Sequence, residues 1–206
     1  MKNTKDFYNK TALEWAYKWY DDESLIPYIK EFFNYLPKKP SILDLCCGAG
    51  YESMRMKKLG ADVVGLDFSE ESIEIARERN TDIKFVIEDM LNDYSYLGKF
   101  DGCVVIAGLV HLPNEKLSIA FERIYSILND NGFLFVAVKE GTGKNERSSY
   151  TEIDGEKYDR DFYLHTSEEL KLYSFKKFEF ISEIVFDKNS IWKYYIFKKV
   201  TQLINK

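Results

Sequence analysis

Two acidic residues and two glycines carry the chemistry of the first half of the chain. Asp44 lies in a short apolar run that leads into Gly48 and Gly50, and Asp67 ends the next apolar run. Small residues after a strand let the backbone approach a ligand and direct helix amides at an anionic or carboxylate-bearing group. An acid about 20 residues further on is placed to bind ribose hydroxyls. The pattern predicts a site for an adenosine-type ligand.

Ser53 and Asp44 discriminate between adenosine cofactors. A nicotinamide-type Gly-x-Gly-x-x-Gly beginning at Gly48 would need a glycine where the chain has Ser53. This difference weakens the interpretation as a nicotinamide oxidoreductase. The Asp44 carboxylate would repel a pyrophosphate but attract a cationic amino acid or sulfonium. S-adenosylmethionine carries both cations, so the turn favours it. In the alternative interpretation, Asp44 only organises the amides of its turn by hydrogen bonding.

Alternating strands and helices are expected to position these residues. Helical spacing predicts helices over residues 51–59, 70–79 and 113–128, the second of them capped by Ser69. This alternation predicts an α/β fold with a doubly wound, mostly parallel sheet and helices on both faces. The apolar runs that predict its parallel strands are residues 42–45, 62–66, 83–87, 102–106 and 133–138.

Both ends of the chain differ from this alternating centre. Aromatic residues at helical spacing over residues 7–36 predict two amphipathic helices, so residues 1–40 form a helical cap that covers the sheet or roofs a pocket. Residues 139–165 show no sustained period, and so long a connection is typical of a lid, a binding loop or a disordered segment. A capping box at Thr166 begins a helix to residue 174. Two aromatic-rich antiparallel strands, 178–186 and 190–199, follow it.

Composition limits the class of protein. The 206 residues are 45% hydrophobic and 31% charged, which predicts one globular domain over residues 1–206. A net charge of -5 argues against a nucleic-acid partner. The three cysteines and two histidines lack disulfide or zinc-site spacing, so we expect reduced thiols and no metal. Without a signal-peptide pattern or a membrane-spanning run, we expect a cytoplasmic protein without membrane attachment, as a monomer or homodimer.

Taken together, these motifs resemble the class I S-adenosylmethionine-dependent methyltransferases, in particular small bacterial members that act on small molecules. The resemblance is strong over about residues 8–138 and looser beyond them. The family's first motif, Asp-x-Gly-x-Gly-x-Gly, is matched by residues 44–50, with Cys46 in place of the first glycine. The resemblance implies S-adenosyl-L-methionine as cofactor, S-adenosyl-L-homocysteine as product, and a seven-stranded, Rossmann-like sheet with a reversed last strand.

The same resemblance implies a set of cofactor contacts. Asp67 matches the acid that binds the ribose hydroxyls, and Asp89 matches the acid that meets the adenine amino group. The segment after the fourth strand matches the one that lines the methionine end, and Tyr8 lies in a segment similar to an N-terminal cap. The implied cofactor-binding residues are Asp44, Cys46, Gly48, Gly50, Asp67, Phe68, Asp89, Met90, Ile106, Ala107, Tyr8 and Trp15.

Methyl transfer depends on positioning more than on acids or bases. It is an in-line displacement at a carbon activated by positive sulfur, so near-attack geometry supplies most of the catalysis. Where the acceptor loses a proton, a nearby base helps, and His111 lies where the crevice at the strand ends should open. His111 is therefore the candidate catalytic residue, with an ordinary loop histidine as the alternative. His111, Tyr163 and His165 are the candidate substrate contacts.

Three functions stay open at this point. The leading one is methylation of a small-molecule acceptor, because the aromatic residues of the cap and of residues 139–165 suit small, partly apolar ligands. The second is an RNA or protein methyltransferase, against which the acidic balance counts. The third is a module that binds S-adenosylmethionine without turnover.

Overall fold

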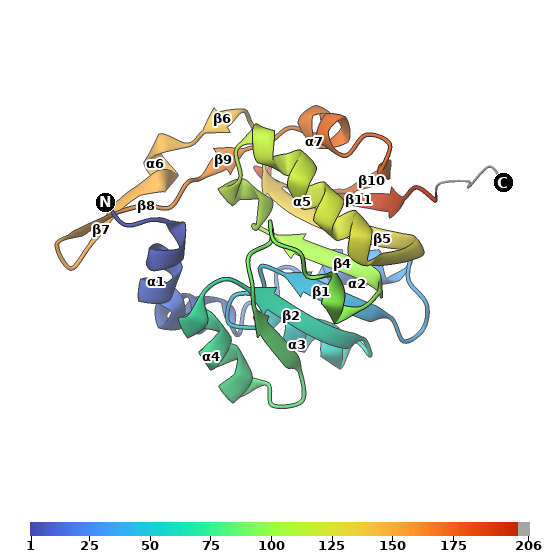
Figure 1. Cartoon of the computed structure of the whole chain (residues 1–206), viewed down its shortest axis with the longest axis horizontal. Helices are drawn as coiled ribbons and strands as arrows, with labels where there is room; N and C mark the ends of the chain where they lie inside the picture. Colours follow the sequence, from blue (N-terminus) through green and yellow to red (C-terminus); the bar gives the residue numbers. More distant parts are fainter. Residues whose placement is uncertain (202–206) are drawn as a thin grey trace.

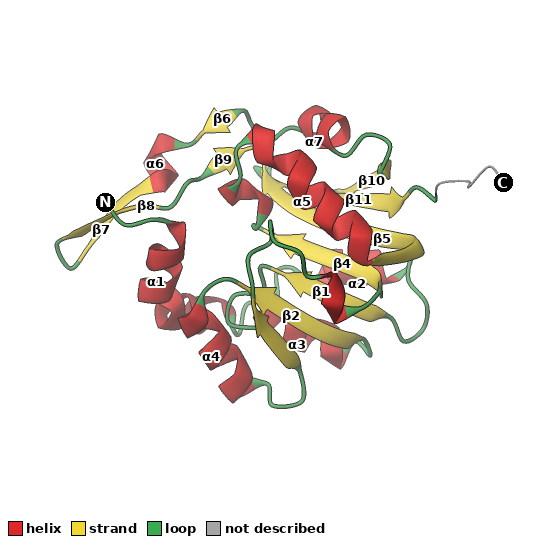
Figure 2. Ribbon diagram, in the orientation of Figure 1, coloured by secondary structure: helices red, strands yellow, loops and turns green. Residues whose placement is uncertain are grey.

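The structure is a computed structural model and describes residues 1–201. A seven-stranded sheet lies at its centre, with helices on both faces (Figures 1 and 2). The strand order is β10-β11-β5-β4-β1-β2-β3. These strands are β1 (Ser41–Leu45), β2 (Asp62–Asp67), β3 (Lys84–Ile87), β4 (Phe100–Ile106), β5 (Leu128–Lys139), β10 (Phe178–Ile184) and β11 (Trp192–Lys199).

The directions of the strands decide where ligand-binding residues gather. β1 is parallel to β2 and β4, β2 to β3, and β4 to β5. β11 lies between β5 and β10 and is antiparallel to both, so β11 is the reversed strand. The predicted doubly wound, Rossmann-like sheet with a reversed last strand is confirmed. Because parallel strands end at one edge, the loops after β1, β2, β4 and β5 meet there.

Helices cover both faces of the sheet and bury two clusters of side chains. Met56 and Ile42 belong to the cluster under α2, α3 and α4, whereas Phe121 and Leu43 belong to the cluster under α5 and α7. Strands buried on both faces explain the continuous apolar runs of the sequence. Within residues 1–201, no helix combines the length and apolar character needed to span a bilayer. The helices are α1 (Thr4–Trp19), α2 (Ile26–Phe33), α3 (Tyr51–Lys58), α4 (Glu70–Arg79), α5 (Asn114–Ile127), α6 (Glu146–Ser149) and α7 (Ser167–Tyr173), with short 3-10 turns η1 (Ser95–Leu97) and η2 (Leu109–His111).

Several predicted boundaries shift by a few residues. Leu128, expected to end a helix, begins β5 because it pairs with Phe100 of β4. The last two strands are shorter than predicted, and residues 185–191 connect them. The first helix starts earlier than expected, at Thr4, because Asn3 and Asp6 form a capping box in which each side chain accepts the other residue's backbone N–H.

Residues 139–165, called the insert below, contain regular structure that the sequence pattern did not predict. β6 (Gly143–Lys144) pairs with β9 (Tyr163–Leu164), and β7 (Tyr150–Ile153) forms a hairpin with β8 (Glu156–Asp159). Strands this short are too brief to give a recognisable period. The hairpin binds the N-terminal segment: Lys2 N donates to Lys157 O, and Asp159 N donates to Lys2 O, both at 2.9 Å. The insert and α1 therefore lie side by side (Figure 1).

Candidate active site

A cavity of about 600 Å³ opens at the carboxyl ends of β1, β2, β4 and β5, between α1 and the insert. It brings most of the predicted site residues together, although they come from separate elements. The predicted residues that line it are Tyr8, Trp15, Asp44, Cys46, Gly48, Asp67, Phe68, Asp89, Met90, Ile106, Ala107 and His111. Gly50, Tyr163 and His165 do not line this cavity.

The turn after β1 runs through left-handed backbone. Cys46 has φ 64°, and Gly48 and Gly50 have φ 52° and 77°. A side chain at such a φ costs about 1–2 kcal/mol, so Cys46 carries strain at the position where the related motif has glycine. Ala107, at the end of β4, is held at φ 56°. Both strained residues line the cavity, as is common at ligand sites.

Gly50 does not line the cavity, and its role is in packing. A Cβ at this position would lie 2.8 Å from Phe85 Cζ and 3.1 Å from Ala76 Cβ. The glycine therefore lets the start of α3 approach β3 and α4 closely. The motif alone does not distinguish a glycine required for packing from a glycine required for ligand contact.

We expect Gly50→Ala to lower the free energy of unfolding by about 2–4 kcal/mol, from left-handed strain and overpacking together. Gly60→Ala is the matched control, because Gly60 also has positive φ (100°) but no atom lies within 4 Å of its added Cβ. Urea denaturation of both variants measures the difference. Equal losses would show that packing around Gly50 is not tight.

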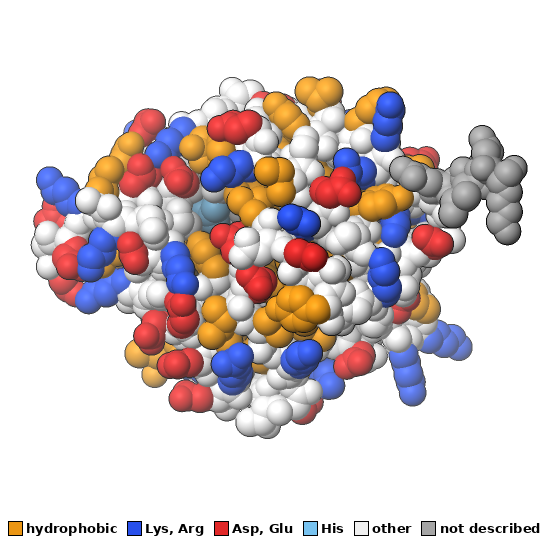
Figure 3. Space-filling view, viewed as in Figure 1, with side chains coloured by type: hydrophobic (Ala, Val, Ile, Leu, Met, Phe, Trp, Pro, Cys, Tyr) orange, Lys and Arg blue, Asp and Glu red, His pale blue; other side chains and the backbone are white. Residues whose placement is uncertain are grey.

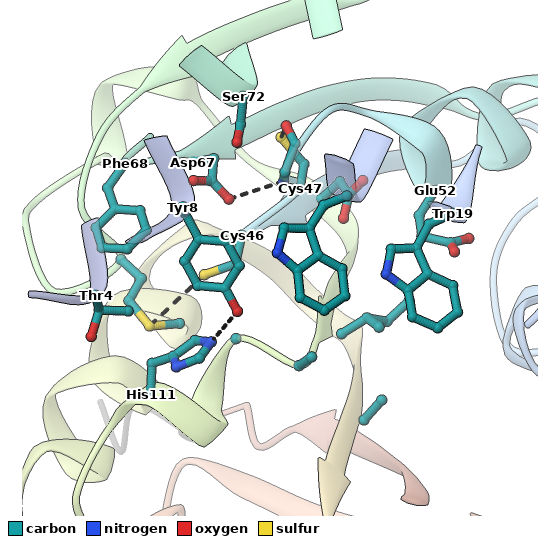
Figure 4. Close-up of a pocket in the computed structure, with 18 of the residues that line it drawn as sticks. Thr4, Tyr8, Trp19, Cys46, Cys47, Glu52, Asp67, Phe68, Ser72 and His111 are labelled. Atoms are coloured by element: carbon teal, nitrogen blue, oxygen red, sulfur yellow. Dashed lines mark hydrogen bonds between the residues drawn. The ribbon is translucent and has the colours of Figure 1, made fainter. Parts of the chain in front are cut away.

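Asp67 links the turns after β1 and β2. Its Oδ2 accepts the Gly48 N–H and its Oδ1 accepts the Ser69 N–H, both at 2.9 Å. Burial raises the pKa of Asp67, while these amides oppose the shift. Each carboxylate oxygen keeps a further lone pair, so the group retains the capacity to accept two ligand hydroxyls. Figure 4 shows it beside Phe68 and Tyr8.

Asp44 is buried beneath the same turn. The Ser53 hydroxyl donates to its Oδ2 at 2.5 Å. Ser53, which occupies the position of the third glycine in the nicotinamide motif, is therefore a hydrogen-bond partner of Asp44. Burial raises the pKa of Asp44 to about 7, against the effect of the Ser53 hydrogen bond. A cationic group bound nearby would favour the charged carboxylate.

Glu52 is a residue of the site that sequence reasoning missed. Its side chain lines the cavity, and Oε1 accepts from Arg55 Nη1 at 2.8 Å. Oε2 is buried without a hydrogen-bond partner among residues 1–201, as is Trp15 Nε1. Burial raises the pKa of Glu52 to about 7, although Arg55 lowers it. The sequence alone does not distinguish Glu52 and Arg55 from an exposed i,i+3 ion pair on a helix. Two orphaned buried polar atoms beside one cavity fit a polar ligand.

His111 and Tyr8 form a hydrogen-bonded pair across the cavity (Figure 4). Tyr8 Oη lies 2.9 Å from His111 Nε2, and His111 Nδ1 lies 2.8 Å from Asp161 O and 3.2 Å from Arg160 O. Carbonyl oxygens only accept, so Nδ1 carries a proton. Burial lowers the pKa of His111 to about 4, with a further contribution from the charge of Arg160. His111 is therefore neutral, and its Nε2 accepts from the Tyr8 hydroxyl.

This arrangement has the geometry of an oriented base. The insert fixes the imidazole through two carbonyls, and the lone pair on Nε2 accepts the hydroxyl of Tyr8 in α1. Burial raises the pKa of Tyr8, so its hydroxyl stays protonated at neutral pH. Such a pair can accept a proton from a ligand through Tyr8.

His165 and Tyr163 lie apart from this pair. His165 is fully buried, with Nδ1 3.1 Å from Asn114 Oδ1 and Nε2 3.0 Å from Leu109 O. These bonds attach the end of the insert to η2 and α5. Tyr163 belongs to β9 and is only partly buried. Both residues support the insert, and their expected contact with substrate has no geometric support in the cavity.

Residues 42–132 match the protein family described as "Methyltransferase domain". The strand order of the whole sheet, with β11 reversed, is that of the class I methyltransferase fold. Over the matched residues the chain is therefore similar to class I, S-adenosylmethionine-dependent methyltransferases. The match contains the turn after β1, Asp67, Asp89 and His111, whereas the cap and the insert lie outside it.

The curated relatives are aligned with the chain over about half of their own length. The putative methyltransferase YqeM of Bacillus subtilis (strain 168) is 32% identical over 108 residues, which are 50% of this chain and 44% of the relative. A ubiquinone biosynthesis O-methyltransferase of Histophilus somni (strain 2336) is 33% identical over 128 residues, 58% of this chain and 52% of the relative. The chain spans about half the length of the curated relatives it matches.

Solved structures resemble nearly the whole chain. The magnesium protoporphyrin IX methyltransferase of Synechocystis PCC 6803 with bound SAM has a TM-score of 0.70 at 16% identity, covering 95% of both chains. The Burkholderia thailandensis 1,6-didemethyltoxoflavin-N1-methyltransferase, with bound 1,6-didemethyltoxoflavin and S-adenosylhomocysteine, has a TM-score of 0.72 at 16% identity, covering 96% of this chain and 87% of that one. At these identities the likeness shows the fold.

Proposed function

We propose that this chain transfers a methyl group from S-adenosyl-L-methionine to a small-molecule acceptor and releases S-adenosyl-L-homocysteine. The observation that carries the proposal is the continuity of the cavity, which extends from Asp67 and Asp89 to the Tyr8–His111 pair. Its volume of about 600 Å³ lies in the range of small-molecule sites. In two of the solved structures that share the fold, the bound ligand is SAM or S-adenosylhomocysteine.

The residues present fit this cofactor. Asp67 would offer lone pairs to the ribose hydroxyls, Phe68 and Met90 would flank the adenine, and Asp44 would attract the cationic methionine end; all four residues line the cavity. The orphaned Trp15 Nε1 and Glu52 Oε2 lie in the wall of the same cavity and are free to bond a polar ligand. When bound, S-adenosylmethionine supplies a methyl group on a positively charged sulfur.

The chain's own contribution is orientation and removal of a proton. The acceptor's O–H or N–H gives its proton to Tyr8 Oη as the Tyr8 proton moves to His111 Nε2, so Tyr8 stays neutral and His111 becomes an imidazolium. The imidazolium that forms is stabilised by the carbonyls of Arg160 and Asp161 at Nδ1. In this proposal residues 1–40 form the cap and the insert covers the acceptor end, and together they keep the reacting groups away from bulk water.

A panel of acceptors tests the proposal, scored by formation of S-adenosylhomocysteine. Small phenols, carboxylic acids and heteroaromatic amines are compared with bulk RNA and with denatured protein. We expect turnover with a subset of the small molecules, because residues of α1 and of the insert line the cavity and its volume of about 600 Å³ suits ligands of this size. Turnover only with RNA or protein would favour a macromolecule methyltransferase, and tight cofactor binding without turnover on any acceptor would favour a binding module.

A further inference from the structure

Two cations without carboxylate partners flank the acceptor end of the cavity. Arg160 and Lys139 both line it, are partly buried, and form no salt bridge within residues 1–201. Both lie against one ring: Arg160 Cζ is 5.3 Å and Lys139 Nζ is 5.8 Å from the centroid of Phe162. By contrast, Lys144 in the insert pairs with Asp159 at 2.8 Å and with Asp161 at 3.0 Å.

Arg160 is held in place by groups other than carboxylates. Its Nε donates to Ser148 O at 2.7 Å, and its Cζ lies 4.9 Å from the centroid of Phe7. The guanidinium also lies close enough to both groups for its charge to oppose the rise that burial causes in the pKa of Tyr8 and to add to the lowering of the pKa of His111. A preorganised, partly desolvated guanidinium is a strong site for a carboxylate or phosphate.

Charges in the cavity wall are segregated. Its acids come from the ends of β1 to β3, from α3 and from the turn after α1, and are Asp22, Asp44, Glu52, Asp67, Glu88 and Asp89. Its cations come from the opposite side, which contains His111, and are Lys116, Lys139 and Arg160. The acidic half suits the cationic cofactor, and the basic half is left for the acceptor. Figure 3 shows the histidine surface recessed between hydrophobic and charged side chains.

We infer that the acceptor is a small aromatic molecule carrying a carboxylate, which Arg160 and Lys139 bind so that its nucleophilic atom faces Tyr8. The aromatic part follows from Phe162, against whose ring both cations lie, and from Trp192, which pairs with Lys139 in the sheet; both residues line the cavity. This inference rests on the proposed function, because it assigns the acceptor of that same site.

An anionic acceptor would also assist the chemistry. In the free protein the charge of Arg160 lowers the pKa of His111 and so weakens it as a base. A carboxylate on Arg160 would offset that charge and strengthen His111 once the acceptor is in place. Proton removal would then be coupled to binding of the correct acceptor.

Calorimetry on the protein saturated with S-adenosylhomocysteine tests the inference without turnover. The probes are two matched pairs, benzoate with benzamide and indole-3-acetate with indole-3-acetamide. We expect the carboxylate of at least one pair to bind roughly 10-fold to 100-fold more tightly than its amide. Arg160→Gln should remove this preference, whereas Arg160→Lys should keep part of it and Arg147→Gln, at an exposed position of α6, should leave it unchanged.

Lys139→Gln serves as a second variant because Lys139 Nζ has no hydrogen-bond partner among the described residues, so its loss should not disturb the insert. It should reduce the preference for carboxylates as well. Equal affinity for acid and amide in both pairs, or a preference that survives both Arg160→Gln and Lys139→Gln, would overturn the inference. A protein that fails to bind S-adenosylhomocysteine would instead contradict the proposed function.

Discussion

His111→Asn is expected to lower kcat by roughly 10² to 10⁴-fold with an acceptor that loses a proton on methylation, the range typical of a lost general base. Asparagine can still donate to the carbonyls of Arg160 and Asp161, so the insert should stay in place, but it offers no basic nitrogen to Tyr8. Steady-state kinetics with saturating cofactor measures the loss. The affinity for S-adenosylhomocysteine should change little, because His111 lies at the acceptor end.

The pH profile gives an independent check on the same residue. Only neutral His111 can accept a proton, and burial lowers its pKa to about 4. Activity should therefore be insensitive to His111 titration from about pH 5 upward and should fall as the pH drops through about 4. Tyr8→Phe should also lower kcat, since it removes the hydroxyl between the acceptor and the imidazole.

His165→Asn is the matched control for His111→Asn. His165 is buried in hydrogen bonds with Asn114 and Leu109 and does not line the cavity. Its replacement should lower stability and leave the kcat of folded protein nearly intact. A His111→Asn enzyme within a few-fold of the parent would refute the base and leave positioning as the source of catalysis.

The centre of the fold was predictable from sequence because each signal there is local. Each of these signals can be recognised within about ten residues of sequence. They are the apolar runs of the strands, the N-cap at Ser69 and the closely spaced glycines of the first turn. Parallel strands then bring Asp44 and Asp67 to one edge without further information. The same logic predicts that Asp89 and Ala107 lie at this edge, since Asp89 comes two residues after β3 and Ala107 directly follows β4.

The rest of the site depends on contacts that no local pattern encodes. Tyr8 and His111 are 103 residues apart, and their pairing requires α1 to be held over η2 by the insert. Arg160 reaches the cavity because the β7–β8 hairpin folds against the N-terminus, and strands of two to four residues leave no period to predict that. Within the insert, Phe162 faces the cavity, whereas His165 is directed into the packing against α5. This is why Phe162 and Arg160 line the cavity, whereas Tyr163 and His165 do not.

Asp67→Ala is expected to weaken S-adenosylmethionine and S-adenosylhomocysteine binding by about 1.5–3 kcal/mol, roughly 10-fold to 100-fold, which is the range for lost hydrogen bonds to a charged group. Two effects add in this variant: the ribose hydroxyls lose their acceptor, and the Gly48 and Ser69 amides lose the carboxylate that fixes the turn. Calorimetric titration with S-adenosylhomocysteine measures the sum.

A second substitution separates these two effects. Asp67→Asn keeps the size of the side chain and one carbonyl oxygen, so it should preserve part of the turn while losing the charge, and its affinity should fall between those of Asp67→Ala and the parent. Asp62→Ala, at the exposed start of the same strand, should bind like the parent. If Asp67→Asn binds like the parent and Asp67→Ala does not, the carboxylate acts mainly by shaping the turn. If all three variants bind like the parent, the cofactor lies elsewhere in the cavity, because no ligand that contacts a buried carboxylate on both oxygens can be indifferent to its removal.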